Sequence, residues 1–335
     1  MRKVMEFVID SHRQMRKNIN DFRSGFIAIL GKPNVGKSTL VNTLLGQKIA
    51  AVSPRPQTTR RRQLGILTTT DAQLVFVDTP GVHIPRHKLG QFFNQEAEEA
   101  LDGVDIILFL VDASTEPDED DQRIASLLST LRRRPDLVLG LNKLDLLSAE
   151  ALAARRTAYQ ALVPAVLSAG ASTALDTGVQ DVPVLAFSAT SRAGLNELVA
   201  ALKARLPVRP PEFPEEQLTD LYEREIAAEL IREAALIYLR DEVPHALAVR
   251  LDEFTERGEE GAFIAATLFV ERDSQKGIVI GEGGAMLKKI GSAARKEIEA
   301  MSGRKVFLEL RVKLSKNWRD DEDALRRFGY KIKKK

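Results

Sequence analysis

Eight residues near the start of the chain read Gly31-Lys32-Pro33-Asn34-Val35-Gly36-Lys37-Ser38 and match the phosphate-binding pattern G-x-x-x-x-G-K-[ST]. In this pattern the glycines let several backbone N–H groups face one phosphate, the lysine reaches the β- and γ-phosphate oxygens, and the final hydroxyl coordinates Mg²⁺. An apolar strand at 26–30 precedes it, and residues 38–45 can begin a helix whose N-terminal dipole favours an anion. A Gly-rich turn that binds nothing would not need this context, so we predict a P-loop.

The composition indicates two globular domains. At 335 residues the chain is long enough for two cores, and its hydrophobic fraction of 44% and charged fraction of 29% are ordinary. No apolar run approaches the roughly 18 residues of a membrane span. Cysteine is absent, which excludes disulfides and thiolate metal sites and fits a reducing cytosol. The first 22 residues lack the apolar core of a signal peptide, so we expect a cytoplasmic protein.

Positive charge gathers at the C-terminus although the net charge is only +2. Residues 303–335 contain 12 Lys or Arg and 5 Asp or Glu. Such an excess attracts polyanions, and a solvated basic tail would have the same composition. On charge alone, both interpretations stay open.

A second nucleotide motif follows a predicted loop. Residues 46–62 contain two prolines and the run Gln57-Thr58-Thr59-Arg60, which we interpret as a long mobile loop. Predicted strands at 64–67 and 74–77 come next, and the second leads directly into Asp78-Thr79-Pro80-Gly81. An acidic residue at the end of a buried strand beside a P-loop is where Mg²⁺ needs a carboxylate, usually through water.

A third motif points to guanine. After a predicted loop at 82–90, a helix at 91–101 and an apolar strand at 106–111, the strand at 137–141 ends in Asn142-Lys143-Leu144-Asp145. The ionised carboxylate of Asp145 can only accept hydrogen bonds, so it suits the N1–H and 2-amino groups of guanine, whereas adenine offers neither. A polar turn after a strand is the structural alternative. The position of N-K-L-D after the other two motifs favours guanine recognition.

The remaining segments complete an α/β domain. A last strand at 183–187 ends in Ser188-Ala189-Thr190, where a backbone N–H can meet the guanine O6, and a helix at 194–206 closes the domain. Strands that alternate with helices predict a doubly wound, mostly parallel sheet with its ligand at the carboxyl ends of the strands. We therefore divide the chain into an N-terminal extension at 1–23, a nucleotide-binding domain at 24–206, a Pro-rich linker at 207–216 and a smaller α+β domain at 217–335.

The second domain has the element order of an RNA-binding module. A helix at 219–240, strands at 246–255 and 262–271, a helix at 285–301 and a strand at 305–314 fit the order αββααβ. The loop Gly281-Glu282-Gly283-Gly284 opens a helix, as in KH domains, which clamp about four unpaired nucleotides. A Gly-rich turn alone would explain the loop equally well; the element order and the basic stretch favour RNA.

The loop carries no Lys or Arg at its variable positions, Glu282 and Gly283. Attraction of phosphate must therefore come from neighbouring cations. Aromatic residues are few besides Phe307, so Ile278 and Ile280 are expected to provide the apolar platform. The predicted RNA-binding residues are Ile278, Ile280, Gly281, Glu282, Gly283, Gly284, Lys288 and Lys289, with Lys276 and Arg295 as further cations.

Taken together, the motifs G-K-P-N-V-G-K-S, Q-T-T-R, D-T-P-G, N-K-L-D and S-A-T, followed by V-I-G-E-G-G-A-M-L-K-K-I-G, resemble the Era family of bacterial ribosome-associated GTPases. The resemblance covers roughly 24–330 and combines a G domain with a C-terminal type II KH domain. It implies GTP hydrolysis, binding to the 3′ end of small-subunit ribosomal RNA and a role in maturation of that subunit. The extension at 1–23 and a segment near 167–181 fall outside the pattern, and their roles stay open.

The expected nucleotide site follows from these motifs. GTP-binding residues are Gly31, Lys32, Pro33, Asn34, Val35, Gly36, Lys37, Ser38, Asp78, Thr79, Pro80, Gly81, Val82, Asn142, Lys143, Leu144, Asp145, Ser188 and Ala189. We expect Ser38, Thr59 and Asp78 to hold Mg²⁺, with Thr59 preferred to Thr58. Catalytic roles are assigned to Asn34, Lys37, Thr59 and Gly81.

Hydrolysis is expected to be slow. Many small GTPases have a water-orienting glutamine just after D-x-x-G, but this chain has Val82, which cannot orient water. In related P-loop GTPases an asparagine at the position of Asn34 helps to hold K⁺, and we carry this over as a hypothesis. His83 and His87 are weaker candidates as general bases, because a histidine in an exposed loop is usually solvated.

Other functions stay open at this stage. The chain could be an RNA-binding assembly factor in which GTP is only an ordering ligand and hydrolysis is incidental. A P-loop ATPase or small-molecule kinase is opposed by N-K-L-D and by the lack of a recognisable lid. We expect a monomer, with the basic ends as candidates for peripheral contact with the cytoplasmic face of the membrane.

Overall fold

The computed structural model describes residues 21–53, 55, 59–82, 87–131, 135–162, 182–256, 258 and 261–330. The predictions for residues 1–20, Gln57, Thr58, His83 and the segment 167–181 lie outside these residues. Two compact units divide the chain. The first comprises residues up to 31, 63–78 and 100–220; the second comprises 32–62, 79–99 and 221–335. Among the described residues, no helix is long and apolar enough to span a membrane.

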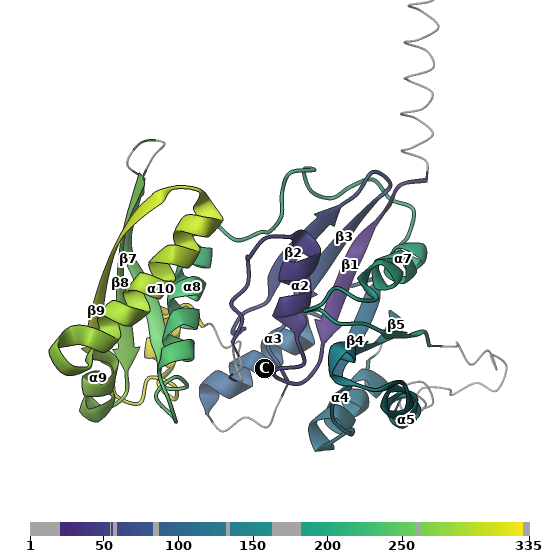
Figure 1. Cartoon of the computed structure of the whole chain (residues 1–335), viewed down its shortest axis with the longest axis horizontal. Helices are drawn as coiled ribbons and strands as arrows, with labels where there is room; N and C mark the ends of the chain where they lie inside the picture. Colours follow the sequence, from purple (N-terminus) through teal and green to yellow (C-terminus); the bar gives the residue numbers. More distant parts are fainter. Residues whose placement is uncertain are drawn as a thin grey trace, which may run out of the picture. The chain divides into compact units, whose positions relative to one another are not determined.

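The first unit contains a six-stranded sheet with the order β2-β3-β1-β4-β5-β6. Its strands are β1 (Arg23–Leu30), β2 (Gln63–Thr68), β3 (Ala72–Asp78), β4 (Ile106–Asp112), β5 (Asp136–Asn142) and β6 (Val184–Ala186). All neighbouring pairs are parallel except β2 and β3, which are antiparallel (Figure 1). Every residue of β3 and β4 is buried, as expected for central strands of a parallel sheet. The predicted mostly parallel α/β sheet is confirmed.

Local capping sets the helix starts of the first unit. Among its described residues the helices are α4 (Glu119–Ser129), α5 (Ala149–Gln160) and α7 (Leu195–Arg205). The Asp118 carboxylate accepts hydrogen bonds from the backbone N–H groups of Asp120 and Asp121, and three acidic residues occupy the first turn of α4. The Ser148 hydroxyl accepts from the Ala151 N–H and so caps the first turn of α5.

The linker at 207–216 packs against the first unit. The buried side chain of Gln73 donates to the carbonyl oxygen of Phe213 at 2.8 Å and accepts from the backbone N–H groups of Glu212 and Phe213. The Ser24 N–H donates to the carbonyl oxygen of Pro207. Through these contacts the first unit continues to Asp220.

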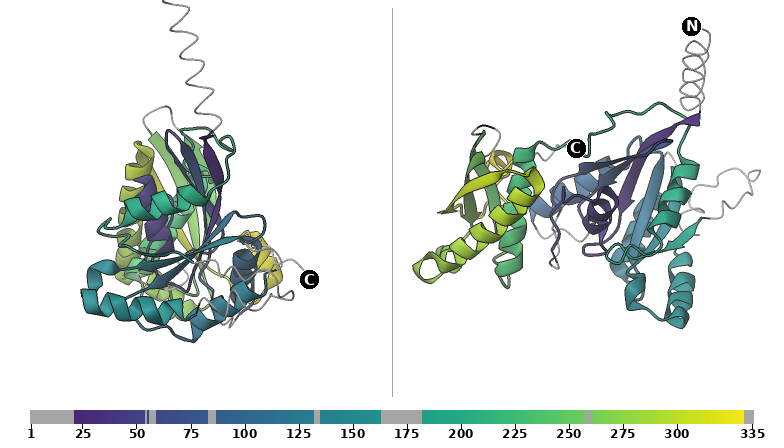
Figure 2. Two further views of the ribbon diagram at one scale, coloured as in Figure 1. Left: turned by 90° about the vertical axis from the view of Figure 1, so that its right-hand side faces the viewer. Right: turned by 45° about the horizontal axis from the view of Figure 1, so that its top comes forward.

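The second unit is built on a three-stranded sheet. Its strands are β7 (Ala248–Glu256), β8 (Gly261–Val270) and β9 (Lys305–Leu314), with β7–β8 antiparallel and β8–β9 parallel. Helices α8 (Glu223–Tyr238) and α10 (Ala285–Ser302) lie side by side on one face (Figures 1 and 2). Apolar residues of both helices and of β8 share one buried core. With α9 (Asp273–Ile280), this is the predicted αββααβ order.

The segment at 79–99 also belongs to the second unit. Helix α3 (Lys88–Glu99) begins three residues before the predicted start at 91. The Asp320 carboxylate accepts from the Lys88 N–H at 3.1 Å, and the carbonyl oxygen of Arg319 accepts from the Leu89 N–H at 3.1 Å. Residues far along the chain thus satisfy N–H groups in the first turn of α3, which extends the helix into the predicted loop at 82–90.

The predicted mobile loop at 46–62 is held at both ends. Arg60 is only 2% exposed; its guanidinium donates to the carbonyl oxygen of Leu247 at 2.8 Å and lies 5.7 Å from the ring centroid of Trp318. The Lys48 ammonium pairs with Glu233 at 2.8 Å and with Glu297 at 2.9 Å. These contacts explain why 32–62 groups with 221–335 rather than with the rest of the predicted nucleotide-binding domain.

Candidate nucleotide and RNA sites

The P-loop connects β1 to α2 (Lys37–Leu45). Asn34 and Gly36 have φ values of 65° and 99°, so the chain makes the tight turn that the glycine-rich pattern predicts. The Lys37 ammonium donates to the carbonyl oxygen of Lys32 at 3.0 Å and is therefore folded back over the loop. Helix α2 has no acidic residue in its first turn, so its N-terminus is suited to an anion.

Two predicted Mg²⁺ ligands meet in the second unit. The Oγ atom of Ser38 and the Oγ1 atom of Thr59 lie 2.6 Å apart, although 21 residues separate them in the chain. Their hydroxyl oxygens are hard ligands of the kind that Mg²⁺ prefers. A magnesium ion at these hydroxyls would neutralise phosphate charge. Thr58 lies outside the described residues.

The glycine of D-x-x-G is required by a close approach to the P-loop. A Cβ atom at Gly81 would lie 2.7 Å from the backbone nitrogen of Pro33 and 2.8 Å from its Cα. No larger residue fits there without a backbone shift. This contact brings two of the predicted motifs together.

Gln63 contacts a predicted site residue and was missed by sequence reasoning. It is the first residue of β2 and pairs in register with Asp78, the last residue of β3. Its side-chain amide donates to Asp78 Oδ2 at 3.2 Å, and both side chains are buried. This bond orients the carboxylate expected to serve Mg²⁺. The signal was available, because a short connection between two antiparallel strands sets their register.

The two motifs that are predicted to read guanine meet in the first unit. Asn142 is 2% exposed, and its Oδ1 atom accepts from the Ala189 N–H at 2.9 Å. The Leu144 N–H donates to the carbonyl oxygen of Phe187 at 3.1 Å. Asp145 has an exposed side chain on a 3₁₀ turn (Leu144–Leu146). N-K-L-D is therefore joined by hydrogen bonds to Ala189 of S-A-T and to the preceding Phe187, and the predicted acceptor for guanine, Asp145, is exposed.

Asp112, the last residue of β4, is a second residue missed from the sequence. It pairs in register with Asn142, and its carboxylate contacts the Lys143 ammonium at 2.5 Å. Burial alone would raise the pKa of Asp112, but hydrogen bonds from Lys143 and Ser114 outweigh it and hold the pKa below the ordinary value. The contact with Asp112 thereby holds the side chain of Lys143, whose φ is 67°.

The loop of the predicted RNA site requires glycine. Gly281, Gly283 and Gly284 have φ values of 72°, 55° and 82°. A Cβ atom at Gly281 would lie 2.8 Å from both the backbone nitrogen and the Cβ of Met286. The loop forms a 3₁₀ turn (Glu282–Gly284) before α10, which has no acidic residue in its first turn and so presents an N-terminus suited to phosphate.

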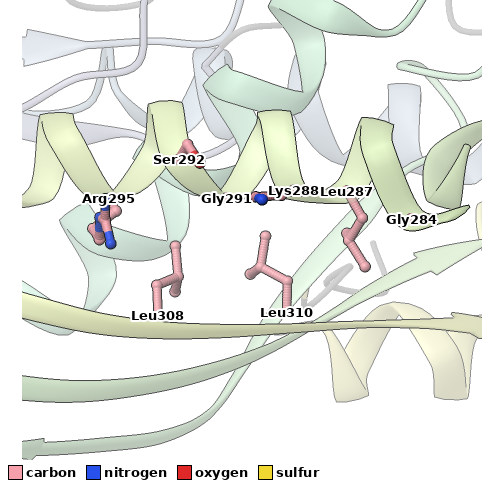
Figure 3. Close-up of a pocket in the computed structure, with 8 residues that line it drawn as sticks. All are labelled: Gly284, Leu287, Lys288, Gly291, Ser292, Arg295, Leu308 and Leu310. Atoms are coloured by element: carbon pink, nitrogen blue, oxygen red, sulfur yellow. The ribbon is translucent and has the colours of Figure 1, made fainter.

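Beside this loop lies a groove of about 420 Å³ between α10 and β9. Figure 3 shows Leu308 and Leu310 on the strand facing α10, with Lys288 and Arg295 on the helix. A Cβ atom at Gly291 would lie 3.3 Å from Leu310, so a larger residue would narrow the groove. Groove residues that the sequence did not single out are Leu287, Gly291, Ser292, Leu308 and Leu310.

The predicted RNA-binding residues do not all lie together. Gly284 and Lys288 line the groove, and Arg295 joins them. Ile278 is 50% exposed on α9, whereas Ile280 is half-buried. The Lys289 ammonium lies 4.5 Å from the ring centroid of Tyr238 on α8 and is not among the residues that line the groove.

Comparisons with known proteins agree with this geometry. The family described as 50S ribosome-binding GTPase matches residues 26–143, and the KH domain family matches residues 242–319. The chain is 47% identical to GTPase Era of Geobacter metallireducens over 93% of this chain and 99% of that protein. It is 43% identical to GTPase Era of Heliobacterium modesticaldum over 92% and 97%.

The chain belongs to the GTPase Era family. Among solved structures, it is similar to Era in complex with MgGDPNP and nucleotides 1506–1542 of 16S ribosomal RNA, with a TM-score of 0.84 and 35% identity over 93% of this chain and 100% of that one. A variant of Aquifex aeolicus Era bound to GDP·AlF4⁻ gives a TM-score of 0.79, at 35% identity over the same shares. The resemblance drawn from the motifs is confirmed, and the chain is a GTPase with a C-terminal KH domain.

Proposed function

We propose that this Era family member binds the 3′ end of small-subunit ribosomal RNA through its KH domain under the control of GTP, and thereby assists maturation of the small ribosomal subunit. The groove between α10 and β9, beside the Gly281–Gly284 loop, carries the proposal. It combines an apolar floor, cationic rims and a helix N-terminus, which suit unpaired bases and their phosphates. The similar Era structure contains MgGDPNP and 16S ribosomal RNA nucleotides, which supports this assignment.

We assign the residues of the nucleotide site from the sequence motifs. The phosphates lie on the Gly31–Ser38 loop, where Lys37 neutralises their charge. Ser38, Thr59 and Asp78 serve Mg²⁺, and the similar Era structure with MgGDPNP supports its use. Asn142, Asp145 and the Ser188-Ala189 backbone read guanine. The domain division 24–206, 207–216 and 217–335 completes the proposal.

Slow intrinsic turnover follows from the residue after D-x-x-G. Val82 is 6% exposed and has no polar side-chain group, so it cannot hold the attacking water. Asn34 is exposed in the P-loop and offers a carbonyl oxygen to K⁺. K⁺ should therefore stimulate turnover, and Asn34→Ala should remove the stimulation while GTP binding persists. Equal stimulation of both proteins would exclude this role.

RNA binding tests the main proposal. The full chain is titrated with a single-stranded RNA of the small-subunit 3′ end in the presence of GTP analogue, GDP or no nucleotide. Tighter binding with the GTP analogue is expected of a nucleotide-controlled switch. Equal affinities in the three states would show two independent modules, and no binding would refute the RNA assignment.

A second measurement distinguishes the proposed function from the alternative, in which GTP only orders the protein. We expect the RNA or small ribosomal subunits to accelerate GTP hydrolysis. Turnover that neither one accelerates would favour an assembly factor whose hydrolysis is incidental.

The cellular setting is part of the same proposal. We place the chain in the cytoplasm as a monomer that contacts the small subunit, with peripheral membrane contact through its basic ends. Sedimentation with anionic liposomes should detect that contact at low salt and lose it at physiological salt. No sedimentation at low salt would exclude it.

A further inference from the structure

An exposed aromatic surface lies on the edge strand of the KH sheet. Phe307 on β9 is 66% exposed, and its ring stacks on that of Phe263 on β8, with centroids 5.7 Å apart and planes inclined by 18°. The two residues are register partners. Because side chains alternate along a strand, Phe307 lies on the face of β9 opposite to Leu308 and Leu310, which line the groove.

The other end of the same face is covered by the chain itself. The ring of Phe269 on β8 packs against Phe328 at a centroid distance of 4.7 Å, within a cluster that includes Trp318. Phe307 lies on the same face, and its large apolar side chain remains exposed to solvent among the described residues. Such exposure is unusual for phenylalanine and often indicates a binding surface.

Cationic residues lie in the groove and beside Phe307. Arg295 lines the groove on the helix, and Lys305 is exposed two residues before Phe307 on the same face of β9. The Glu309 carboxylate is paired with Arg311 at 2.6 Å, which neutralises it. Glu253, another acidic residue of this face, is on β7, two strands from β9. This distribution favours a polyanion over a basic peptide.

We propose that Phe307 stacks against one unpaired base of an RNA strand that leaves the groove past Leu308 and passes around β9. The strand order makes β9 an edge of the sheet, so a single strand separates the groove from the aromatic surface. Stacking on an aromatic ring is tolerant of base identity, because every base has a π face. The inference rests on the proposed function, since the groove must hold the same strand.

Two RNAs distinguish a failure of this inference from a failure of the proposed function. One has four nucleotides, enough to fill a KH groove, and the other extends the same four by two nucleotides at each end, with 2-aminopurine in the extensions. Phe307→Ala should weaken binding of the longer RNA about tenfold and leave the four-nucleotide RNA unchanged. Phe307→Tyr keeps the ring and should bind both as the unsubstituted protein does. The quenching of 2-aminopurine on binding should be lost only in Phe307→Ala.

Tyr222→Ala is the matched control, because Tyr222 is an aromatic residue with 75% exposure that lies before α8. It should change neither affinity, and GTP turnover of all three variants should match that of the unsubstituted chain. Equal affinities of Phe307→Ala and the unsubstituted chain for the longer RNA, or an equal loss for both RNAs, would overturn the inference. If the unsubstituted protein binds neither RNA, the proposed function fails, and this inference fails with it.

Discussion

The side-chain amide of Gln63 donates a hydrogen bond to Asp78 Oδ2 at 3.2 Å, with both residues buried at the paired ends of β2 and β3. A buried amide that holds one carboxylate oxygen restricts the orientation of the other. The carboxylate of D-T-P-G is therefore positioned by a residue outside all of the nucleotide motifs.

Gln63→Leu should raise the Mg²⁺ concentration needed to retain GTP about tenfold, because residues that orient a ligand contribute on that scale to metal affinity. Dissociation of a fluorescent GTP analogue across a Mg²⁺ titration measures this. Gln122→Leu, at an exposed position on α4, controls for the loss of an amide. An unchanged Mg²⁺ dependence in Gln63→Leu would show that Asp78 needs no such support.

Thr59→Ala should slow GTP hydrolysis at least about tenfold, because the Thr59 hydroxyl is placed beside that of Ser38, 2.6 Å away. Thr59→Ser retains the hydroxyl and should restore most of the rate. Thr58→Ala is the neighbouring control and should be nearly silent in single-turnover assays. A larger defect in Thr58→Ala than in Thr59→Ala would transfer the role to Thr58.

Asp145→Asn should change the base specificity of the nucleotide site from guanine to xanthine. An asparagine amide can donate to the 2-oxo group of xanthine and accept from its N1–H, but it faces the 2-amino group of guanine with a donor. GTP affinity should fall by roughly 100-fold, and XTP should become the better ligand. Competition between the two nucleotides measures this preference. A retained preference for GTP would show that Asp145 does not recognise the base.

Asp112→Asn should destabilise the protein near neutral pH by roughly 1–3 kcal/mol, because it weakens a charge-assisted bond to Lys143. The pKa of Asp112 is lowered in the folded state, so its contribution is present above the ordinary value of 3.8 and is lost as the pH falls through the folded value. The difference in unfolding free energy should therefore shrink in acid.

Urea unfolding at about pH 7 and about pH 3 measures this difference. Asp102→Asn, at an exposed position, is the matched control. A destabilisation of equal size at both pH values would show that the charge of Asp112 is not its cause.

Gly281→Ala should weaken RNA binding and leave GTP turnover unchanged. Gly281 has a φ of 72° and a ψ of 172°, a conformation essentially restricted to glycine that costs any other residue on the order of 1–3 kcal/mol, and the new Cβ would also meet Met286 at 2.8 Å. Gly303→Ala has a similar φ of 70° but a ψ of 4°, with no atom within 4 Å of the added Cβ, so it controls for a positive φ alone. Equal RNA affinities of the two variants would show that neither the ψ of Gly281 nor its contact with Met286 shapes the loop.

Much of the fold and of the nucleotide site was predictable because its determinants are local. The run Ile106–Val111 indicates a buried parallel strand by composition, and each motif lies where a predicted strand ends. The pairing of Asp112 with Lys143 and of Gln63 with Asp78 was not predicted, because neither Asp112 nor Gln63 belongs to a motif and each bond depends on the register of two strands.

The sequence by itself determined the order of strands and helices, the P-loop, the guanine motif and the glycine loop of the KH domain, since each depends on residues close together in the chain. Only the tertiary structure decided where α3 begins, which residues line the groove, and that 32–62 and 79–99 group with the C-terminal region. Asp320 satisfies the N–H of Lys88 from 232 positions away, and no local pattern encodes a hydrogen bond over that separation. Backbone donors take whichever acceptor the folded chain brings to them.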